Sequence, residues 1–126
     1  MSIFDGKDYL VGDWIPISAT RNIHIYDGIK NLNTTIIYTN KEEDREMQIM
    51  SVYGIDDENK IEKGRARIGI DIFDLSGDQS VDPVNIDRSR VFAHKEEQFT
   101  EELIKDLQMI NTLFDNVHEK VKRVYL

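Results

Sequence analysis

The sequence predicts an α+β fold, in which an antiparallel sheet of four to five strands packs against one long C-terminal helix. Up to about residue 93, the chain holds short runs rich in β-branched and aromatic residues, several of them alternating apolar with polar positions. From about His94 to Tyr125 it has no Gly and no Pro, and helix-forming residues dominate. At 126 residues we expect a single domain, because a chain of this length buries enough surface to build a core.

Residues 1–20 are expected to form an extended arm or an edge strand. Pro16 lies within this segment, and the residue before a proline is pushed toward extended geometry. Trp14 is the only tryptophan, and a side chain with so much apolar surface is expected to cover part of the core.

Residues 21–75 are expected to hold the antiparallel strands. The first alternation, in residues 22–26, puts Ile23 and Ile25 on one face and is followed by Asp27 and Gly28, which favour a turn. Residues 34–39 are rich in β-branched residues and predict the second strand of a hairpin. Its connection, residues 28–33, is longer than a tight turn.

Two further strands are predicted by apolar patterns of different kinds. Residues 47–55 are apolar on both faces, which is typical of a central strand that is covered twice. Residues 65–73 alternate strictly, with four apolar side chains on one face, and this pattern predicts a half-buried strand.

Residues 76–93 are expected to form a loop and a short strand, with the loop extending over about residues 75–89. Residues 94–125 are expected to form the helix. Its apolar positions step alternately by four and three residues, which predicts a continuous seam along one side: Leu103, Leu107, Ile110, Phe114, Val117, Val121 and Val124. Ile104, Met109 and Leu113 broaden this stripe, which favours packing on the sheet over pairing with a second helix.

The composition excludes several functional classes. Sixteen Lys and Arg against 24 Asp and Glu give a formal charge of −8, so we expect binding to neither nucleic acid nor anionic membranes. No stretch is apolar enough to span a bilayer and the first residues lack a signal-peptide pattern, so we expect a cytoplasmic protein. The chain has no cysteine, which excludes disulfides and thiolate chemistry.

Motifs that indicate catalysis or metal binding are missing from the sequence. His24, His94 and His118 do not occur in a metal-ligand spacing, and the acidic loops do not match a calcium-binding loop. Phosphate-binding and nucleophile motifs are absent as well. We therefore expect no enzymatic activity, no cofactor and no metal site.

Four arginines form the candidate binding site. Arg65 and Arg67 are two residues apart, as are Arg88 and Arg90, so each pair lies on one face of a strand. If the two strands are neighbours, the four guanidinium groups gather to bind carboxylate or phosphate oxygens. The alternative is structural ion pairing with Asp71, Asp87 or Glu62. Gly69 leaves a gap beside these side chains that can admit a ligand or another backbone.

These observations favour a small acidic protein-binding domain, such as an inhibitor, an adaptor or an immunity-type protein. Two alternatives stay open: a binder of a small anionic ligand through the arginines, and a subunit of a larger assembly. We also expect a homodimer, because one helix covers only one face of the doubly apolar strand at residues 47–55.

Overall fold

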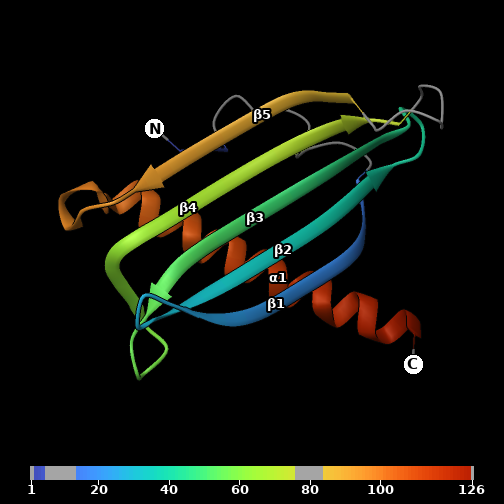
Figure 1. Ribbon diagram of the computed structural model, residues 1–126. Coiled ribbons are helices and arrows are strands. Elements are labelled where there is room, and N and C mark those ends of the chain that lie inside the picture. Colours follow the sequence, from blue (N-terminus) through green and yellow to red (C-terminus); the bar gives the residue numbers. More distant parts are fainter. Residues whose placement is uncertain (1, 5–13, 76–83, 126) are drawn as a thin grey trace.

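The computed structural model describes residues 2–4, 14–75 and 84–125. Five strands form one antiparallel sheet in chain order, with α1 behind it (Figure 1): β1 (Ile15–Tyr26), β2 (Ile29–Asn40), β3 (Arg45–Ile55), β4 (Ile61–Asp74) and β5 (Val84–Ala93). A short 3-10 turn, η2 (Glu96–Gln98), leads into the helix α1 (Glu101–Tyr125). The predicted α+β class, with one long C-terminal helix across a sheet, is confirmed.

The first hairpin is tighter than the sequence indicated. Its turn consists of Asp27 and Gly28 alone, both with positive φ (54° and 75°), and Tyr26 pairs directly with Ile29. Positive φ at both central positions is the requirement of the type I′ turn, whose twist matches that of the strands it joins. The edge strand β1 therefore runs continuously from Ile15 to Tyr26 and joins the predicted N-terminal arm to the strand at residues 22–26.

The strand at the centre of the sheet is β3, as its apolar pattern predicted, but it is covered on one face only. Met47, Ile49 and Tyr53 are buried on the side of α1, whereas Met50 and Val52 on the other side are partly exposed. The expectation of a doubly covered strand was wrong, because the described residues contain one helix and it packs on one face. We call the face turned away from α1 the open face.

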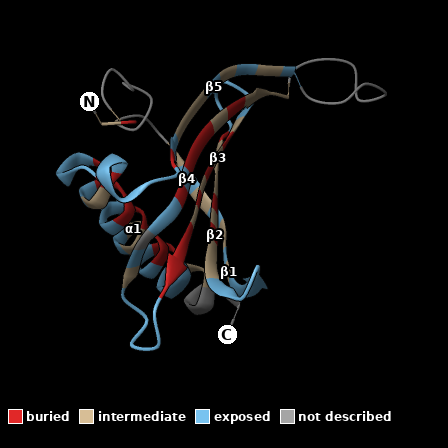
Figure 2. Ribbon diagram, turned by 60° about the vertical axis from the view of Figure 1, so that its left-hand side comes forward, coloured by how far each residue is buried: buried red, intermediate tan, exposed pale blue. Residues whose placement is uncertain are grey.

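The core lies between α1 and the sheet, and Figure 2 shows buried residues along β3, β4 and α1. Leu107 and Ile110 are fully buried, and Phe114 and Val117 nearly so, as the seam predicted. The helix backbone lies closest to β1, then β2 and β3. It therefore lies chiefly over the β1 side of the sheet, and its buried side chains share one core with those of β4. Met109 is half exposed and does not broaden the buried stripe.

The helix begins at Glu101, later than the expected start near His94. Thr100 caps it, because its Oγ1 accepts a hydrogen bond from the backbone N–H of Leu103 (3.2 Å). The preceding segment forms η2, where the Gln98 side chain accepts bonds from the backbone N–H groups of His94 and Lys95. Helix-forming composition alone does not separate these two elements.

The last strand also begins earlier than predicted. Val84–Ala93 forms β5 and pairs with β4 over nearly its whole length, so the second part of the expected loop is strand. The rest of that loop, residues 76–83, lies outside the described residues. Within the described ranges, no helix has the length and apolar character needed to cross a membrane.

Candidate functional site

The four arginines share the open face of β4 and β5. Ala66, Ile68, Ile70 and Ile72 are buried on the α1 side, so the alternating residues of β4 between them face the other way. The register places Phe92 opposite Arg67, Arg90 opposite Gly69, and Arg88 opposite Asp71. The predicted juxtaposition of the two arginine pairs is therefore present in the sheet.

Arg90 is bound to Asp71 through a site made by Gly69. Its Nη1 and Nη2 donate to Oδ1 and Oδ2 of Asp71 at 2.9 and 2.8 Å, a two-pronged ion pair. A Cβ at Gly69 would lie 2.9 Å from Nη1 of Arg90, so the missing side chain is what lets the guanidinium lie across β4. The gap at Gly69 thus holds Arg90, whereas we expected it to admit a ligand or another backbone.

Asp71 is the centre of a small network that also includes Arg88 and Asn85. The Nε of Arg88 lies 3.3 Å from Asp71 Oδ1, and Asn85 donates to the same oxygen. Burial acts to raise the pKa of Asp71, but hydrogen bonds from Arg90 and Asn85 and the charges of both arginines outweigh it, so the pKa is lowered. Cross-strand ion pairing with Asp71 therefore accounts for Arg88 and Arg90.

Arg65 and Arg67 differ from the other pair. Among the described residues, no carboxylate lies within ion-pair distance of either guanidinium. Arg67 contacts the sulfur of Met50 at 3.9 Å, and the guanidinium of Arg65 lies 5.5 Å from the centre of the Tyr26 ring. Both side chains are exposed. The structure thus divides the four arginines into two that are ion-paired and two that are available for binding.

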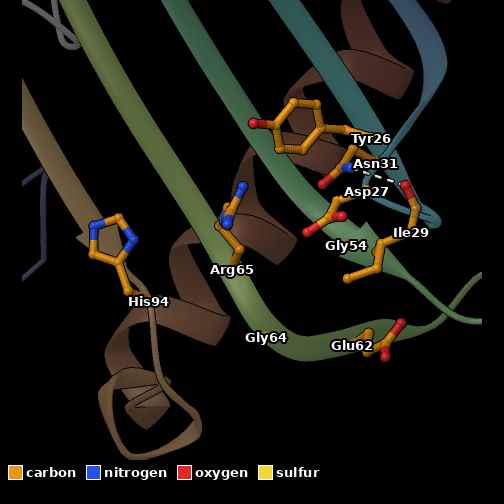
Figure 3. A pocket seen from close by; sticks show the side chains of 9 residues that line it. All are labelled: Tyr26, Asp27, Ile29, Asn31, Gly54, Glu62, Gly64, Arg65 and His94. Carbon is orange, nitrogen blue, oxygen red and sulfur yellow. Dashed lines mark hydrogen bonds between the residues drawn. The ribbon is translucent and has the colours of Figure 1, made fainter.

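A groove on the open face surrounds the two available arginines. It consists of two adjoining hollows of about 150 and 350 Å³, which share Asn31, Arg65 and His94. Figure 3 shows Arg65 in the first hollow, between Tyr26 and His94. Arg67 and Phe92 line the second. Asp27 and Glu62 also line the first hollow, although neither lies within ion-pair distance of Arg65. We call the surface around the two arginines the arginine groove and define it by Tyr26, Asn31, Arg65, Arg67, Phe92 and His94.

Exposed aromatic rings border the arginine groove. Tyr26 is 63% exposed and Phe92 50% exposed, although both rings carry large apolar surfaces. The rings of Phe92 and His94 are stacked with their centres 6.0 Å apart. Exposed rings such as these offer flat apolar faces to a partner.

The sequence indicated the arginines but missed the rest of the groove. Tyr26, Asn31, Phe92 and His94 come from three different strands or their ends, and only the strand register brings them together. A correct alignment of β4 with β5 would have placed Phe92 beside Arg67.

The described residues provide no constellation for metal binding. They contain no group of three or more His, Asp or Glu side chains able to hold an ion. His118 stacks on Phe114 with ring centres 5.3 Å apart, and His24 lies on the open face of β1, opposite Asn31. The exposed guanidinium groups and rings of the arginine groove are of the types that bind anionic and flat apolar groups.

Comparison with known proteins gives one family. A model described as a family of unknown function, DUF7325, matches residues 5–126. No curated protein and no solved structure matches the chain.

Proposed function

The chain belongs to DUF7325, a family of unknown function, and we propose that it is a non-enzymatic binding domain whose arginine groove receives an acidic segment of a partner protein. One observation carries this proposal. Arg65 and Arg67 are exposed and without a carboxylate partner among the described residues, in a chain whose formal charge is −8.

The composition of the groove supports a protein partner. Arginine and exposed aromatic residues are enriched where protein interfaces gain most of their binding energy. Guanidinium groups bind carboxylates in two-pronged geometry, and the rings of Tyr26 and Phe92 offer apolar contact beside them. The open face continues past the groove along β2 and β3, which leaves room for an extended segment.

A small anionic ligand is the second candidate, and the two hollows favour it. The larger hollow, of about 350 Å³, is close to the lower limit of typical ligand pockets, the smaller one lies below it, and Arg65 lines both. The same guanidinium groups bind phosphate oxygens as readily as carboxylates. The two candidates therefore share residues and differ in the size of what they bind.

Nuclear magnetic resonance with ¹⁵N-labelled protein separates the candidates. The probes are a short peptide of alternating glutamate and alanine, its lysine–alanine counterpart, and inorganic phosphate. We expect the glutamate peptide to shift the backbone signals of Asn31, Arg65 and Arg67 in a saturable manner, and the lysine peptide to leave them unchanged. These shifts should disappear in an Arg65→Ala/Arg67→Ala variant and persist in Lys41→Ala/Lys60→Ala, which removes two exposed positive charges elsewhere.

Two outcomes overturn the proposal. If phosphate shifts these signals and the peptide does not, the groove is a small-ligand site. If neither probe acts, or if the control variant loses the shifts as well, the arginine groove has no specific role in binding anions.

A further inference from the structure

Residues 18–26 of the edge strand β1 lack the features that protect edge strands. In the sheet order β1-β2-β3-β4-β5, the two edges are β1 and β5. Natural edge strands are usually protected from other strands by charged residues, proline or a bulge. β5 carries Asp87, Arg88 and Arg90. β1 has Pro16 and a bulge at its start, but residues 18–26 contain no proline, no lysine and no acidic residue.

The only charged side chain in this stretch is turned toward α1. Arg21 donates from Nε to Oγ1 of Thr34 and from Nη2 to Oδ1 of Asn111, and its guanidinium lies 4.0 Å from the centre of the Phe114 ring. Its charge is therefore engaged within the molecule.

Two isoleucines on the same face are left uncovered by the helix. Ile23 is 55% exposed and Ile25 is 74% exposed, although both alternate with Arg21 and so lie on the α1 side of β1. Neighbouring apolar side chains with this much exposure on an edge strand indicate an interaction surface.

The hairpin turn determines which backbone groups of β1 point outward. In a two-residue turn of this type, Tyr26 and Ile29 form a hydrogen-bonded pair, and the pairs alternate from there along an antiparallel ladder. Ile25, Ile23 and Arg21 therefore lie in the pairs whose N–H and C=O groups face away from β2. These groups are the ones that bond to an added strand.

We propose that a second copy of this chain adds its β1 antiparallel to β1, with the two-fold axis at His24. This register puts Ile23 opposite Ile25 of the second copy, and Ile25 opposite Ile23, so the four isoleucines form two facing apolar pairs. It also brings Arg21 level with Asp27 of the second copy at both ends. The two sheets then continue into one sheet of ten strands.

A second copy fits this edge because the stretch is free of acidic residues. Two chains of charge −8 repel each other where acidic surfaces meet. At residues 18–26, two copies can approach without repulsion between acidic side chains. Strand addition there also supplies main-chain hydrogen bonds between the copies.

Cysteine cross-linking tests the register, since the natural chain has no cysteine. In the proposed pairing, the two His24 residues face each other in a non-hydrogen-bonded pair with Cα atoms about 4.5 Å apart, which suits a disulfide. Asn22, two residues away on the same face, is separated from its copy by roughly 13 Å. We expect mild oxidation to link His24→Cys into dimers and to leave Asn22→Cys monomeric. Equal cross-linking of both variants overturns the register.

Sedimentation equilibrium tests the association itself at tens of micromolar protein. We expect a dimer mass for the natural chain and a monomer mass for Ile25→Lys. The matched control Ile86→Lys, which alters an exposed isoleucine on the other edge strand, should stay dimeric. A monomeric natural chain overturns the proposal, and so does a dimer that survives Ile25→Lys. Because Arg65→Ala/Arg67→Ala should not affect this mass, failure here leaves the groove proposal to its own test.

Discussion

At Gly69 a missing side chain decides which arginine is bound within the molecule. The guanidinium of Arg90 occupies the space a Cβ would need and reaches Asp71 from there. Arg65 and Arg67, on the same face of β4, have no ion pair among the described residues and interact instead with the ring of Tyr26 and the sulfur of Met50. The carboxylate of Asp71 thus pairs with Arg88 and Arg90 and leaves Arg65 and Arg67 exposed on the open face.

Replacing Gly69 with valine should displace Arg90 from Asp71. The new side chain collides with the end of a flexible side chain, so we expect the fold to persist while the bonds to Asp71 are lost. The pKa of Asp71 should then rise toward its ordinary value of about 3.9, which a carboxyl-detected NMR titration measures. Gly64→Val is the control, because a Cβ there meets nothing within 4 Å. An unchanged pKa in Gly69→Val contradicts this account of the network.

Asp71 should also make the stability depend on pH in a defined direction. Its pKa is lower in the folded protein than the value of about 3.9 in the unfolded chain. The stability it contributes is therefore complete above that value and is lost as the pH falls through the folded pKa. We expect Asp71→Asn to lower the free energy of unfolding by about 1–2 kcal/mol at neutral pH, and the difference to shrink below about pH 4.

Urea unfolding at pH 7 and pH 3 measures this difference. Asp57→Asn, which changes an exposed carboxylate in a turn, should have little effect at either pH. If Asp71→Asn lowers the free energy of unfolding by the same amount at pH 7 and at pH 3, the charge of the Asp71 carboxylate is not the cause of the loss.

At the scale of elements, α1 determines which sheet face becomes the core. Its seam of apolar residues at steps of four and three covers the α1 side of the sheet, and the open face is left to solvent. The N-terminal segment adds to this side, since Ser2 and the backbone of Ile3 bond to the buried Asp106 of α1. β3 and β4 accordingly have one buried face and one accessible face, whereas the residues of β1 are exposed or only partly buried.

Phe114→Ala tests the placement of the helix. The ring is buried and also lies under the guanidinium of Arg21, so we expect a loss of about 3–5 kcal/mol in the free energy of unfolding. Met109→Ala removes an exposed side chain of the same helix and should change it by less than about 0.5 kcal/mol. Chemical denaturation measures both, and similar losses in the two variants contradict the placement.

The sequence predicted the parts of the fold that follow from local periodicity. Alternation in residues 65–73 assigned the faces of β4 correctly, and the heptad-like spacing identified the buried side of α1 through Val117. The start of α1 at Glu101 was missed because the 3-10 turn before it is also rich in helix formers. The ion pairing of Arg90 was left open, since pairing with Asp71 depends on the β4–β5 register, and residue order alone does not specify that register.

At the scale of the whole molecule, an acidic protein keeps two basic side chains exposed beside aromatic rings. A sheet with one helix has a second face available for contacts, and the arginine groove lies on that face. The β1 edge lies at its border: Tyr26 belongs to both the edge and the arginine groove, whereas Arg65 and Arg67 belong to the groove alone. The proposed activity is therefore a property of the open face, and the core supports it by holding the strands in register.

The affinity for the glutamate–alanine peptide, measured by isothermal titration together with thermal melts, tests the central claim most directly. For Arg65→Ala/Arg67→Ala we predict an affinity at least roughly tenfold weaker, since charge-assisted hydrogen bonds are lost, with the stability changed by less than about 0.5 kcal/mol per substitution. Lys41→Ala/Lys60→Ala should bind as the natural protein does. Full affinity in the arginine variant, or a loss that only accompanies unfolding, would contradict the assignment of the arginine groove as the binding surface.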